Sequence, residues 1–284
     1  MNMKMPLALS AEIERNVAIA LSEDIGGGDL TALLTSGGHV SRGRVVSREA
    51  AVLCGTAWFD ACFLRLDGTA RIDWQAKDGE RITAGQTLCE IAAETRALLT
   101  AERTALNFLQ LLSATATATR RFVDAVAGTG AKIIDTRKTL PGLRLAQKYA
   151  VRAGGGTNHR LGLYDGILIK ENHILAAGGI AAALSSARGL AHPGVFIQVE
   201  VETLAQLGEA LACGAEMILL DNFGLETMRE AVTLTAGRAS LEASGGVDIT
   251  RVRAIAETGV DRISIGSLTK DVRAVDLSLR HVER

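Results

Sequence analysis

The sequence has little of what nucleic-acid-binding proteins use. Aromatic residues make up 4% of its 284 residues, and the formal net charge is −1 at pH 7. Nucleic acid is usually held by a broad basic surface or by aromatic side chains on which bases stack, so this composition argues against DNA or RNA as the partner. Any anionic ligand must therefore be bound by a local cluster of basic residues.

Cysteine pairs and long apolar runs are also missing. The chain has no Cys-x-x-Cys pair and no Cys/His metal spacing among its four cysteines, Cys54, Cys62, Cys89 and Cys213. No apolar run reaches the roughly 18 residues that a membrane span needs. The start, MNMKMPLALS, has neither the apolar length nor the cleavage site of a signal peptide. We therefore expect reduced thiols and a cytoplasmic protein.

What is present is an ordinary globular balance, with 48% hydrophobic and 22% charged residues. This length allows one large domain or two moderate ones. Apolar spacing predicts a helix over 10–22 with Ser10 as a possible N-cap, and helices over 95–111 and 114–127. Short alternating segments between 40 and 92 predict a small antiparallel sheet.

One segment in that sheet resembles part of a different class of protein. DGERITAGQTLCEI, residues 78–91, has the look of the hairpin in biotinyl- or lipoyl-carrier domains, and MKM at 3–5 mimics a biotinylation site. A carrier needs its lysine on a tight turn between the paired strands, whereas Lys4 is some seventy residues away in the sequence. We therefore expect an ordinary β-hairpin here.

After residue 130 the pattern changes to apolar runs that alternate with helical segments. Six such runs occur: KIIDTRK, GILIKEN, FIQVEVE, EMILLDN, ASLEASGG and RISIGS. Strands buried on both faces of a parallel sheet read as nearly continuous apolar runs, and their spacing here matches a repeated strand–helix unit. The expected fold is a parallel α/β barrel.

Polar groups in these runs collect at the carboxyl ends. They are Arg137 and Lys138, Lys170, Glu200, Asp221, Ser244-Gly245-Gly246 and Gly266-Ser267. In parallel barrels that end carries the active site. Strand alternation supports this reading, because Lys170 shares a face with Leu168, and a charge on such a face must point into a polar cavity.

The charges at this rim predict the ligand. Arg137, Lys138, Arg160 and Lys170 outnumber Glu200 and Asp221 by two, before His159 is considered. Arginine and lysine in such a cluster suit a strongly anionic ligand, and the two acids suit Mg²⁺ or sugar hydroxyls. The glycine-containing loops expose backbone N–H groups that can hold a phosphate.

Each feature also has a simpler explanation. A lysine at a strand end often only forms a salt bridge, and glycines after helices are often C-caps. A Schiff-base aldolase remains open, since it uses a lysine at a barrel strand end, as does a non-catalytic sugar-phosphate sensor. The agreement of six strand ends favours a functional site.

The segment TRKTLPGLRLAQKYAVRAGGGTNHRLGLYDGILIKENHI, residues 136–174, closely resembles the signature of the quinolinate phosphoribosyltransferase family, also called nicotinate-nucleotide pyrophosphorylase (carboxylating). LSEDIGGGDLT, VEVETL, ILLDN, EASGGV and DRISIGSLT support the resemblance, which covers almost the entire chain. It implies transfer of phosphoribosyl from phosphoribosyl pyrophosphate to quinolinate, with decarboxylation to nicotinate mononucleotide. The related family associated with molybdate transport lacks the lysine of LIKENH, so Lys170 favours the quinolinate enzyme.

The resemblance also implies an architecture. An N-terminal α/β sandwich would span 1–112 and be joined by the C-terminal tail, 272–284, and an incomplete α/β barrel would span 113–271. Members of the family form homodimers or dimer-based hexamers.

Residue roles follow from the same resemblance. Arg137, His159, Arg160 and Lys170 would surround the quinolinate carboxylates and the nearby pyrophosphate, with Lys138 beside them, and the three glycines 154–156 would let backbone approach the ligand. Arg103 would enter from the partner subunit, and Glu200 and Asp221 would hold the ribose hydroxyls and Mg²⁺. Lys138, Lys170, Glu200 and Asp221 are the implied catalytic residues. The 5-phosphate would lie on Ser244, Gly245, Gly246, Gly266 and Ser267. The chain departs from the family after GSLT, where Lys270 stands in place of a common histidine.

Overall fold

The computed structural model describes residues 7–282 as two compact units. The first contains the residues up to 120, the segment 139–155 and the residues from 269 onward, and the second contains 121–138 and 156–268. The first carries an antiparallel sheet and the second a parallel one, which confirms the predicted mixed α/β class.

The two units divide the chain differently from the predicted domains at 113–120, 139–155 and 269–271, of which 139–155 is the longest. Residues 139–155 group with the first unit because side chains of that unit bind them. Arg15 and Asn16 both donate to the Gly142 carbonyl, at 3.0 and 3.2 Å, and the Tyr149 hydroxyl donates to the Asp78 carboxylate at 2.8 Å.

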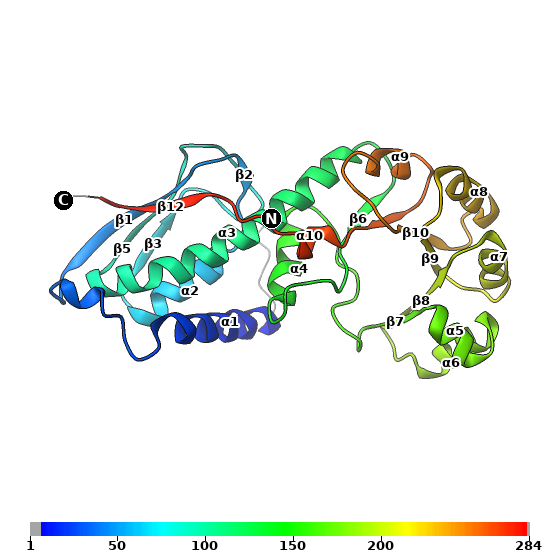
Figure 1. Ribbon diagram of the computed structural model, residues 1–284, viewed down its shortest axis with the longest axis horizontal. Coiled ribbons are helices and arrows are strands. Elements are labelled where there is room, and N and C mark those ends of the chain that lie inside the picture. Colours follow the sequence, from blue (N-terminus) through cyan, green and yellow to red (C-terminus); the bar gives the residue numbers. More distant parts are fainter. Residues whose placement is uncertain (1–6, 283–284) are drawn as a thin grey trace. The chain divides into compact units, whose positions relative to one another are not determined.

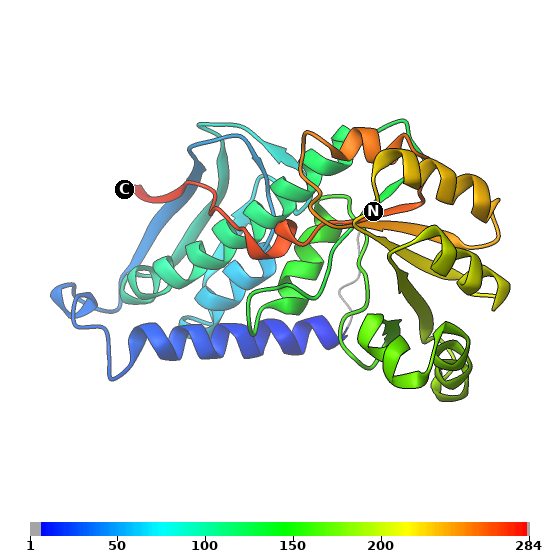
Figure 2. The same ribbon diagram turned by 45° about the vertical axis from the view of Figure 1, so that its right-hand side comes forward.

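The first unit is a four-stranded antiparallel sheet with helices packed on one face (Figures 1 and 2). The strand order is β12-β1-β5-β3, so the C-terminal strand lies at one edge beside the first strand of the chain. The elements of this part are α1 (Leu7–Ile25), a 3-10 turn (Ala32–Leu34), β1 (Val40–Ser47), β2 (Ala51–Val52), α2 (Thr56–Leu66), β3 (Arg71–Trp74), β4 (Arg81–Ile82), β5 (Thr87–Glu94), α3 (Thr95–Ala125), α4 (Arg144–Ala153) and β12 (Leu277–Val282).

Helix α2 lies inside the region predicted to be only sheet. Its buried side chains Trp58, Phe59, Cys62 and Phe63 have the spacing of a helix face, but their aromatic character favours strands in sequence. No local side chain caps the helix. The Asp78 carboxylate, distant in sequence, accepts the N–H groups of Gly55 and Thr56 at 3.1 and 3.2 Å instead.

Helix α3 is continuous over the break predicted near residue 112. The run SATATAT looks unfavourable for a helix because its hydroxyls compete for backbone hydrogen bonds. In the structure the hydroxyls of Ser113, Thr117 and Thr119 have partners, whereas the buried Thr115 hydroxyl has none. Ser113 bonds both backbone groups of Cys54, at 2.9 and 3.1 Å, and Thr117 donates to the Ser113 carbonyl at 2.6 Å while accepting the Val52 N–H at 2.8 Å.

The hairpin predicted at residues 78–91 is wrong. Strand β4 pairs with β2, whereas β5 pairs with β1 and β3, so the two halves of the segment belong to different sheets. Lys4 lies outside the described residues.

Helix α1 begins one turn before the predicted start, so Ser10 lies within it and is not its N-cap. The apolar stripe of Ile13 and Val17 extends back to Leu9, which packs against the core.

The second unit is a six-stranded parallel sheet with the order β6-β11-β10-β9-β8-β7, and all six predicted strands are present. Helices lie along the outer side of this sheet (Figure 1). Its elements are β6 (Lys132–Ile134), β7 (Gly166–Ile169), α5 (Glu171–Ala177), α6 (Ile180–Leu190), β8 (Phe196–Val201), α7 (Leu204–Ala212), β9 (Met217–Asp221), α8 (Leu225–Thr235), β10 (Ser240–Ser244), α9 (Val252–Ala256) and β11 (Arg262–Ser264), followed by α10 (Ser267–Lys270).

The parallel sheet does not close. Within residues 7–282, β6 and β7 are the two edge strands and do not pair with each other. Thr157 covers the free edge of β6 instead, because its N–H donates to the Ile133 carbonyl at 2.9 Å and its carbonyl accepts the Asp135 N–H at 3.2 Å. The segment that follows, Asn158 to Arg160, is thereby held beside the carboxyl end of β6.

No helix within residues 7–282 has the length and apolar character needed to cross a membrane.

Asp60 is a partly buried acid in the first unit with an altered ionisation. Burial raises its pKa to about 6, the Trp74 indole N–H, which donates to its carboxylate at 2.9 Å, acts in the opposite direction, and the Asp78 carboxylate raises it further. The folded chain holds this proton more tightly than the unfolded chain, whose carboxyl has the ordinary value of 3.8. The resulting stabilisation is complete below about pH 4 and is lost as the pH rises through 6.

Asp60→Asn should therefore increase stability at pH 7.5, by about 1–3 kcal/mol, because the amide still accepts the Trp74 bond but cannot ionise. At pH 4 the variant and the wild type should be equally stable. Urea unfolding at the two pH values measures this. Asp73→Asn, at an exposed position of β3, is the control and should change neither value. An Asp60→Asn protein that is no more stable at pH 7.5 would contradict a raised pKa of Asp60.

Candidate active site

Two cavities lie at the carboxyl ends of the parallel strands, both formed by the second unit. The first has a volume of about 250 Å³, and its lining residues are Asp135, Thr136, Arg137, Lys138, His159, Arg160, Leu168, Lys170, Glu200, Leu219, Glu242, Ser244 and Ser264. The second has a volume of about 380 Å³, with Thr136, Lys138, Lys170, Glu200, Asp221, Asn222, Ser244, Gly245, Gly246, Val247, Ser264, Ile265 and Gly266 around it. Residues common to both, among them Lys138, Lys170 and Glu200, mark where the cavities adjoin.

The structure thus brings together most residues that the strand-end pattern singled out. Eleven of the thirteen predicted substrate-binding residues line one cavity or both. The exceptions are Ser267, which begins α10 directly after Gly266, and Arg103, which is exposed on α3 in the first unit.

Lys170 lies where the two cavities adjoin. Its Nζ is 3.3 Å from the Glu200 Oε2, and 51% of its side chain is exposed. Its backbone N–H donates to His173 Nδ1 at 3.0 Å, which fixes the start of α5. Through this bond His173 orients the backbone at Lys170.

Arg160 is the buried cation of the first cavity, with 9% of its surface exposed. Its guanidinium donates to the Gly166 carbonyl at 2.9 Å. Desolvation lowers its pKa, the neighbouring Arg137 lowers it further, and Asp165 acts in the opposite direction. A buried guanidinium with a second one near it favours the binding of an anion, which would offset their repulsion.

Two acids that sequence reasoning missed also line the first cavity. Asp135 is 0% and Glu242 is 1% exposed. With these acids the four basic residues face four carboxyl groups, so the predicted surplus of two positive charges is wrong for the lining as a whole. Both acids are fully buried, however, while Lys138 and Lys170 are exposed, so the accessible rim keeps its basic character.

The lining of the second cavity includes a loop with two consecutive glycines, Gly245 and Gly246. Gly245 has φ +105°, and a Cβ there would be 2.1 Å from the Asn222 Oδ1. The Asn222 side chain in turn donates to Asp221 at 2.9 Å, and its own φ is 57°. The close approach to Asn222 therefore requires glycine at 245, and this loop lies beside the Asp221 carboxylate in the lining of the second cavity.

Gly154, the first of the three glycines at 154–156, has a packing role. A Cβ on Gly154 would lie 2.5 Å from the Ala116 carbonyl oxygen and 2.7 Å from the Thr119 Cβ. The missing side chain therefore lets α4 end against α3, and this glycine serves packing within the first unit.

Glu200 and Asp221 are the two residues expected to bind Mg²⁺. Within the described range 7–282, no three His, Cys, Asp or Glu side chains form a group that could hold a metal ion alone. Both carboxylates nevertheless line the second cavity. One or two carboxylates combined with phosphate oxygens of the substrate are a usual set of ligands for Mg²⁺, so the residues present fit that ion.

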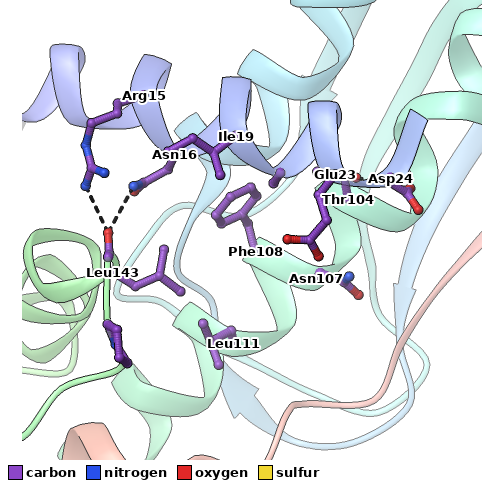
Figure 3. Close-up of a pocket in the computed structure, with 13 residues that line it drawn as sticks. Arg15, Asn16, Ile19, Glu23, Asp24, Thr104, Asn107, Phe108, Leu111 and Leu143 are labelled. Carbon is purple, nitrogen blue, oxygen red and sulfur yellow. Dashed lines mark hydrogen bonds between the residues drawn. The ribbon is translucent and has the colours of Figure 1, made fainter. Parts of the chain in front are cut away.

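A further cavity of about 350 Å³ lies in the first unit, between α1, α3 and residues 141–143 (Figure 3). Apolar side chains such as Phe108 and Leu143 share it with the carboxyls of Glu23 and Asp24. It has acids and no glycine-rich strand-end loop, so it does not suit a phosphorylated anion, and we assign no activity to it.

An open parallel α/β barrel with basic side chains and a glycine loop at its strand ends defines the class: barrel enzymes that act on phosphorylated anions. Two family models match the chain: "Quinolinate phosphoribosyl transferase, N-terminal domain" over residues 29–113 and "Quinolinate phosphoribosyl transferase, C-terminal domain" over residues 115–280. The chain belongs to the quinolinate phosphoribosyltransferase family.

Known proteins are similar to this chain over nearly its full length. The chain is 44% identical to a probable nicotinate-nucleotide pyrophosphorylase (carboxylating) of Bacillus subtilis, covering 90% of this chain and 89% of that protein. It is 46% identical to the nicotinate-nucleotide pyrophosphorylase (carboxylating) of Mycobacterium leprae, with 92% and 94% covered. The structure of the nicotinate-nucleotide pyrophosphorylase from Francisella tularensis superposes with a TM-score of 0.94 at 44% identity, covering 98% of each chain.

The glycine loop makes a stability prediction. Gly245→Ala combines a Cβ clash with the Asn222 side chain and a φ of +105°, whereas Gly246→Ala has a φ of +55° and open space around its Cβ. We expect Gly246→Ala to lose about 1 kcal/mol of unfolding free energy and Gly245→Ala to lose about 3 kcal/mol. Denaturant unfolding of the two variants measures the difference. Equal losses would mean that Asn222 moves aside freely.

Proposed function

We propose that the two adjoining cavities transfer phosphoribosyl from phosphoribosyl pyrophosphate to quinolinate, with loss of CO₂. This is the activity of the family, the carboxylating nicotinate-nucleotide diphosphorylase reaction of de novo NAD biosynthesis. The observation that carries the proposal is the sharing of Lys138, Lys170 and Glu200 by a cavity rich in arginine and a cavity with a glycine loop. A two-substrate transfer needs such an arrangement, because the reacting atoms must meet where two binding sites adjoin.

Quinolinate, a pyridine dicarboxylate, suits the first cavity. Arg137, His159, Arg160 and Lys170 line it, and Arg160 is desolvated beside Arg137. Two carboxylates can satisfy these cations together, whereas the monocarboxylate nicotinate would leave one of them unpaired at a cost.

Phosphoribosyl pyrophosphate suits the second cavity. Backbone N–H groups of Ser244, Gly245 and Gly246, with the loop of Gly266 and Ser267, would hold the 5-phosphate. Glu200 and Asp221 would accept hydrogen bonds from the ribose hydroxyls. Lys138 and Lys170 then lie where the pyrophosphate leaves, since they line both cavities.

The chemistry requires no nucleophilic side chain. The pyridine nitrogen uses its lone pair to form a bond to ribose C1 while the bond from C1 to pyrophosphate breaks, and the pyrophosphate keeps that electron pair. The ring carboxylate next to the nitrogen then leaves as CO₂, and the carbon takes up a proton. Lys138 and Lys170 stabilise the charge that develops on the leaving group, and the walls of the cavities fix the two substrates in line.

Magnesium would be held by Glu200 and Asp221. When bound, Mg²⁺ neutralises charge on the pyrophosphate that departs. The ion pair between Lys170 and Glu200, at 3.3 Å, would keep the lysine ammonium next to the departing pyrophosphate.

We also propose a homodimer, or a hexamer made of dimers, in which Arg103 completes the partner's site. Arg103 is exposed, and Asn107, one turn further along α3, is exposed as well, which leaves this face of the helix accessible to a second copy.

The free thiols of the buried Cys54, Cys62 and Cys89 suit a reducing compartment, which supports a cytoplasmic location.

The direct test is to incubate the protein with quinolinate, phosphoribosyl pyrophosphate and Mg²⁺ and to measure CO₂ and nicotinate mononucleotide.

Lys170→Ala should lower kcat/KM about a hundred-fold or more, because the charge on the leaving group loses a cation that stabilises it. The matched control is Lys132→Ala, at the opposite end of a barrel strand and exposed. Its kcat/KM should stay within about two-fold of wild type. Equal turnover of quinolinate and nicotinate, or labelling by borohydride in the presence of a carbonyl substrate, would reject this function.

The role of Arg103 can be tested by mixing inactive subunits. Arg103→Ala and Asp221→Ala should each be inactive alone. If Arg103 acts in the partner's site, a mixed dimer has one site with both defects and one intact site. Random exchange makes half of the dimers mixed, so about a quarter of wild-type activity should return. No recovery after demonstrated subunit exchange would place Arg103 in its own subunit's site or outside catalysis.

A further inference from the structure

We propose that Glu242 and Gln198 are positioning residues: a buried chain of hydrogen bonds that starts at Glu242 fixes His159 as its neutral Nε2–H tautomer and so holds Arg160 in place at the first cavity. The inference deepens the proposed function, and its consequence for substrate affinity rests on quinolinate binding in that cavity.

The chain of hydrogen bonds runs through the interior of the barrel. Gln198 Nε2 donates to Glu242 Oε2 at 2.9 Å, and His159 Nε2 lies 2.8 Å from Gln198 Oε1. The same His159 Nε2 is 3.7 Å from Glu242 Oε2, so the carboxylate also faces this nitrogen directly. The Arg160 backbone N–H donates to His159 Nδ1 at 2.7 Å. Glu242 and Gln198 are each 1% exposed, and the His159 side chain is 8% exposed, so water has little access to these groups.

The direction of each bond is determined by the one before it. The Gln198 amide donates its NH₂ group to the Glu242 side chain. Its carbonyl oxygen then faces His159 and requires a donor, which is the Nε2–H group. A neutral imidazole with hydrogen on Nε2 has a lone pair on Nδ1, and that lone pair accepts the Arg160 N–H. The bond to Arg160 therefore identifies the tautomer at the other end of the chain.

Neighbouring contacts leave the ring little freedom. Asp135 accepts the His159 backbone N–H at 2.8 Å and the Asn158 side-chain amide at 2.6 Å. The ring of Phe196 meets the imidazole edge to face, with centroids 5.3 Å apart and an interplanar angle of 75°. Backbone and ring of His159 are thus each held by a buried partner.

The sheet register explains why this chain reaches the reacting groups. Glu242 on β10 is level with Leu219 on β9, and Leu219 is level with Glu200 on β8. Gln198 precedes Glu200 by two residues, so both side chains face the same side of β8. Gln198 reaches past β9 to Glu242 and lies one layer below Glu200, which forms the ion pair with Lys170.

The functional consequence falls on Arg160. Its backbone is held by His159, and its guanidinium is held by the Gly166 carbonyl. Because this guanidinium is buried and interacts with Arg137, a shift of its backbone changes its position relative to Arg137 and to an anion bound in the first cavity. Loss of the chain should therefore weaken binding in the first cavity. The second cavity, whose lining does not include His159, Arg160 or Glu242, should be little affected.

The tautomer can be measured in the unaltered enzyme. Heteronuclear NMR of protein with isotopically labelled imidazole nitrogens distinguishes Nε2–H from Nδ1–H, and His159→Gln assigns the signal among the five histidines. We expect His159 to carry its hydrogen on Nε2. An Nδ1–H signal for His159 in the wild type would overturn the proposal, whatever the activity of the enzyme.

Variants then test the direction of the bonds. In Glu242→Gln the new amide can donate as well as accept, so the order is lost and His159 should show a mixture of tautomers. KM for quinolinate should rise about ten-fold, since one buried charge-assisted hydrogen bond is lost. kcat and KM for phosphoribosyl pyrophosphate should stay within about two-fold. Glu209→Gln, at an exposed position of α7 in the same barrel, is the matched control and should change none of these.

A double replacement separates hydrogen-bond direction from packing. Gln198→Glu alone places two carboxyls in contact and should be worse than Glu242→Gln. Gln198→Glu with Glu242→Gln restores an acceptor for His159 Nε2–H and a donor for that acceptor, so the Nε2–H signal and KM for quinolinate should return toward wild type.

Failure to rescue, or a Glu242→Gln protein with unchanged tautomer and KM, would overturn the proposal. These outcomes differ from a failure of the proposed function, in which the wild type would produce no nicotinate mononucleotide while the NMR result could still be obtained.

Discussion

The six parallel strands all end at one edge of an open sheet. The charged side chains at that edge lie close together, and several of them are buried. In the second unit that edge holds four basic side chains and four carboxyls within two adjoining cavities. None of these groups could be buried alone, because an isolated ion in a protein interior costs several kcal/mol. Pairing is therefore required, and it separates the groups by depth: Asp135 and Glu242 are buried with hydrogen-bond partners, while Lys138 and Lys170 remain exposed at the rim.

This separation explains how one cavity can be nearly neutral and still suit a dianion. The buried carboxyls are engaged by donors from the chain itself: Asp135 by Asn158 and the His159 backbone, and Glu242 by Gln198. The rim cations are closer to solvent and face an arriving substrate. Preorganised groups of this kind stabilise charge in a transition state without further rearrangement, which a transfer from pyrophosphate requires.

The sequence predicts the parts of the fold that local patterns determine. All six parallel strands were found because each is a short apolar run that ends in polar residues. Helix α2 was missed because its N-terminal groups are bound by Asp78, which no local motif reveals. The buried acids were missed for the same reason, since the partners of Asp135 and Glu242 come from distant segments. Lys148 shows the limit most clearly. A lysine on a helix usually faces solvent, yet Lys148 is only 1% exposed, on the face of α4 that holds Ala146, Gln147 and Val151.

Glycines in the family signature show why a motif can be recognised without the role of each residue being known. Gly154 and Gly245 would both stand in a phosphate-binding loop if only their sequence were considered. The close approach at Gly154 is to the Ala116 carbonyl of α3, whereas the one at Gly245 is to Asn222, beside Asp221. The first glycine is thus required by helix packing and the second by the geometry of the second cavity. A sequence motif records that a side chain is excluded, and only the surrounding structure shows whether packing or substrate excludes it.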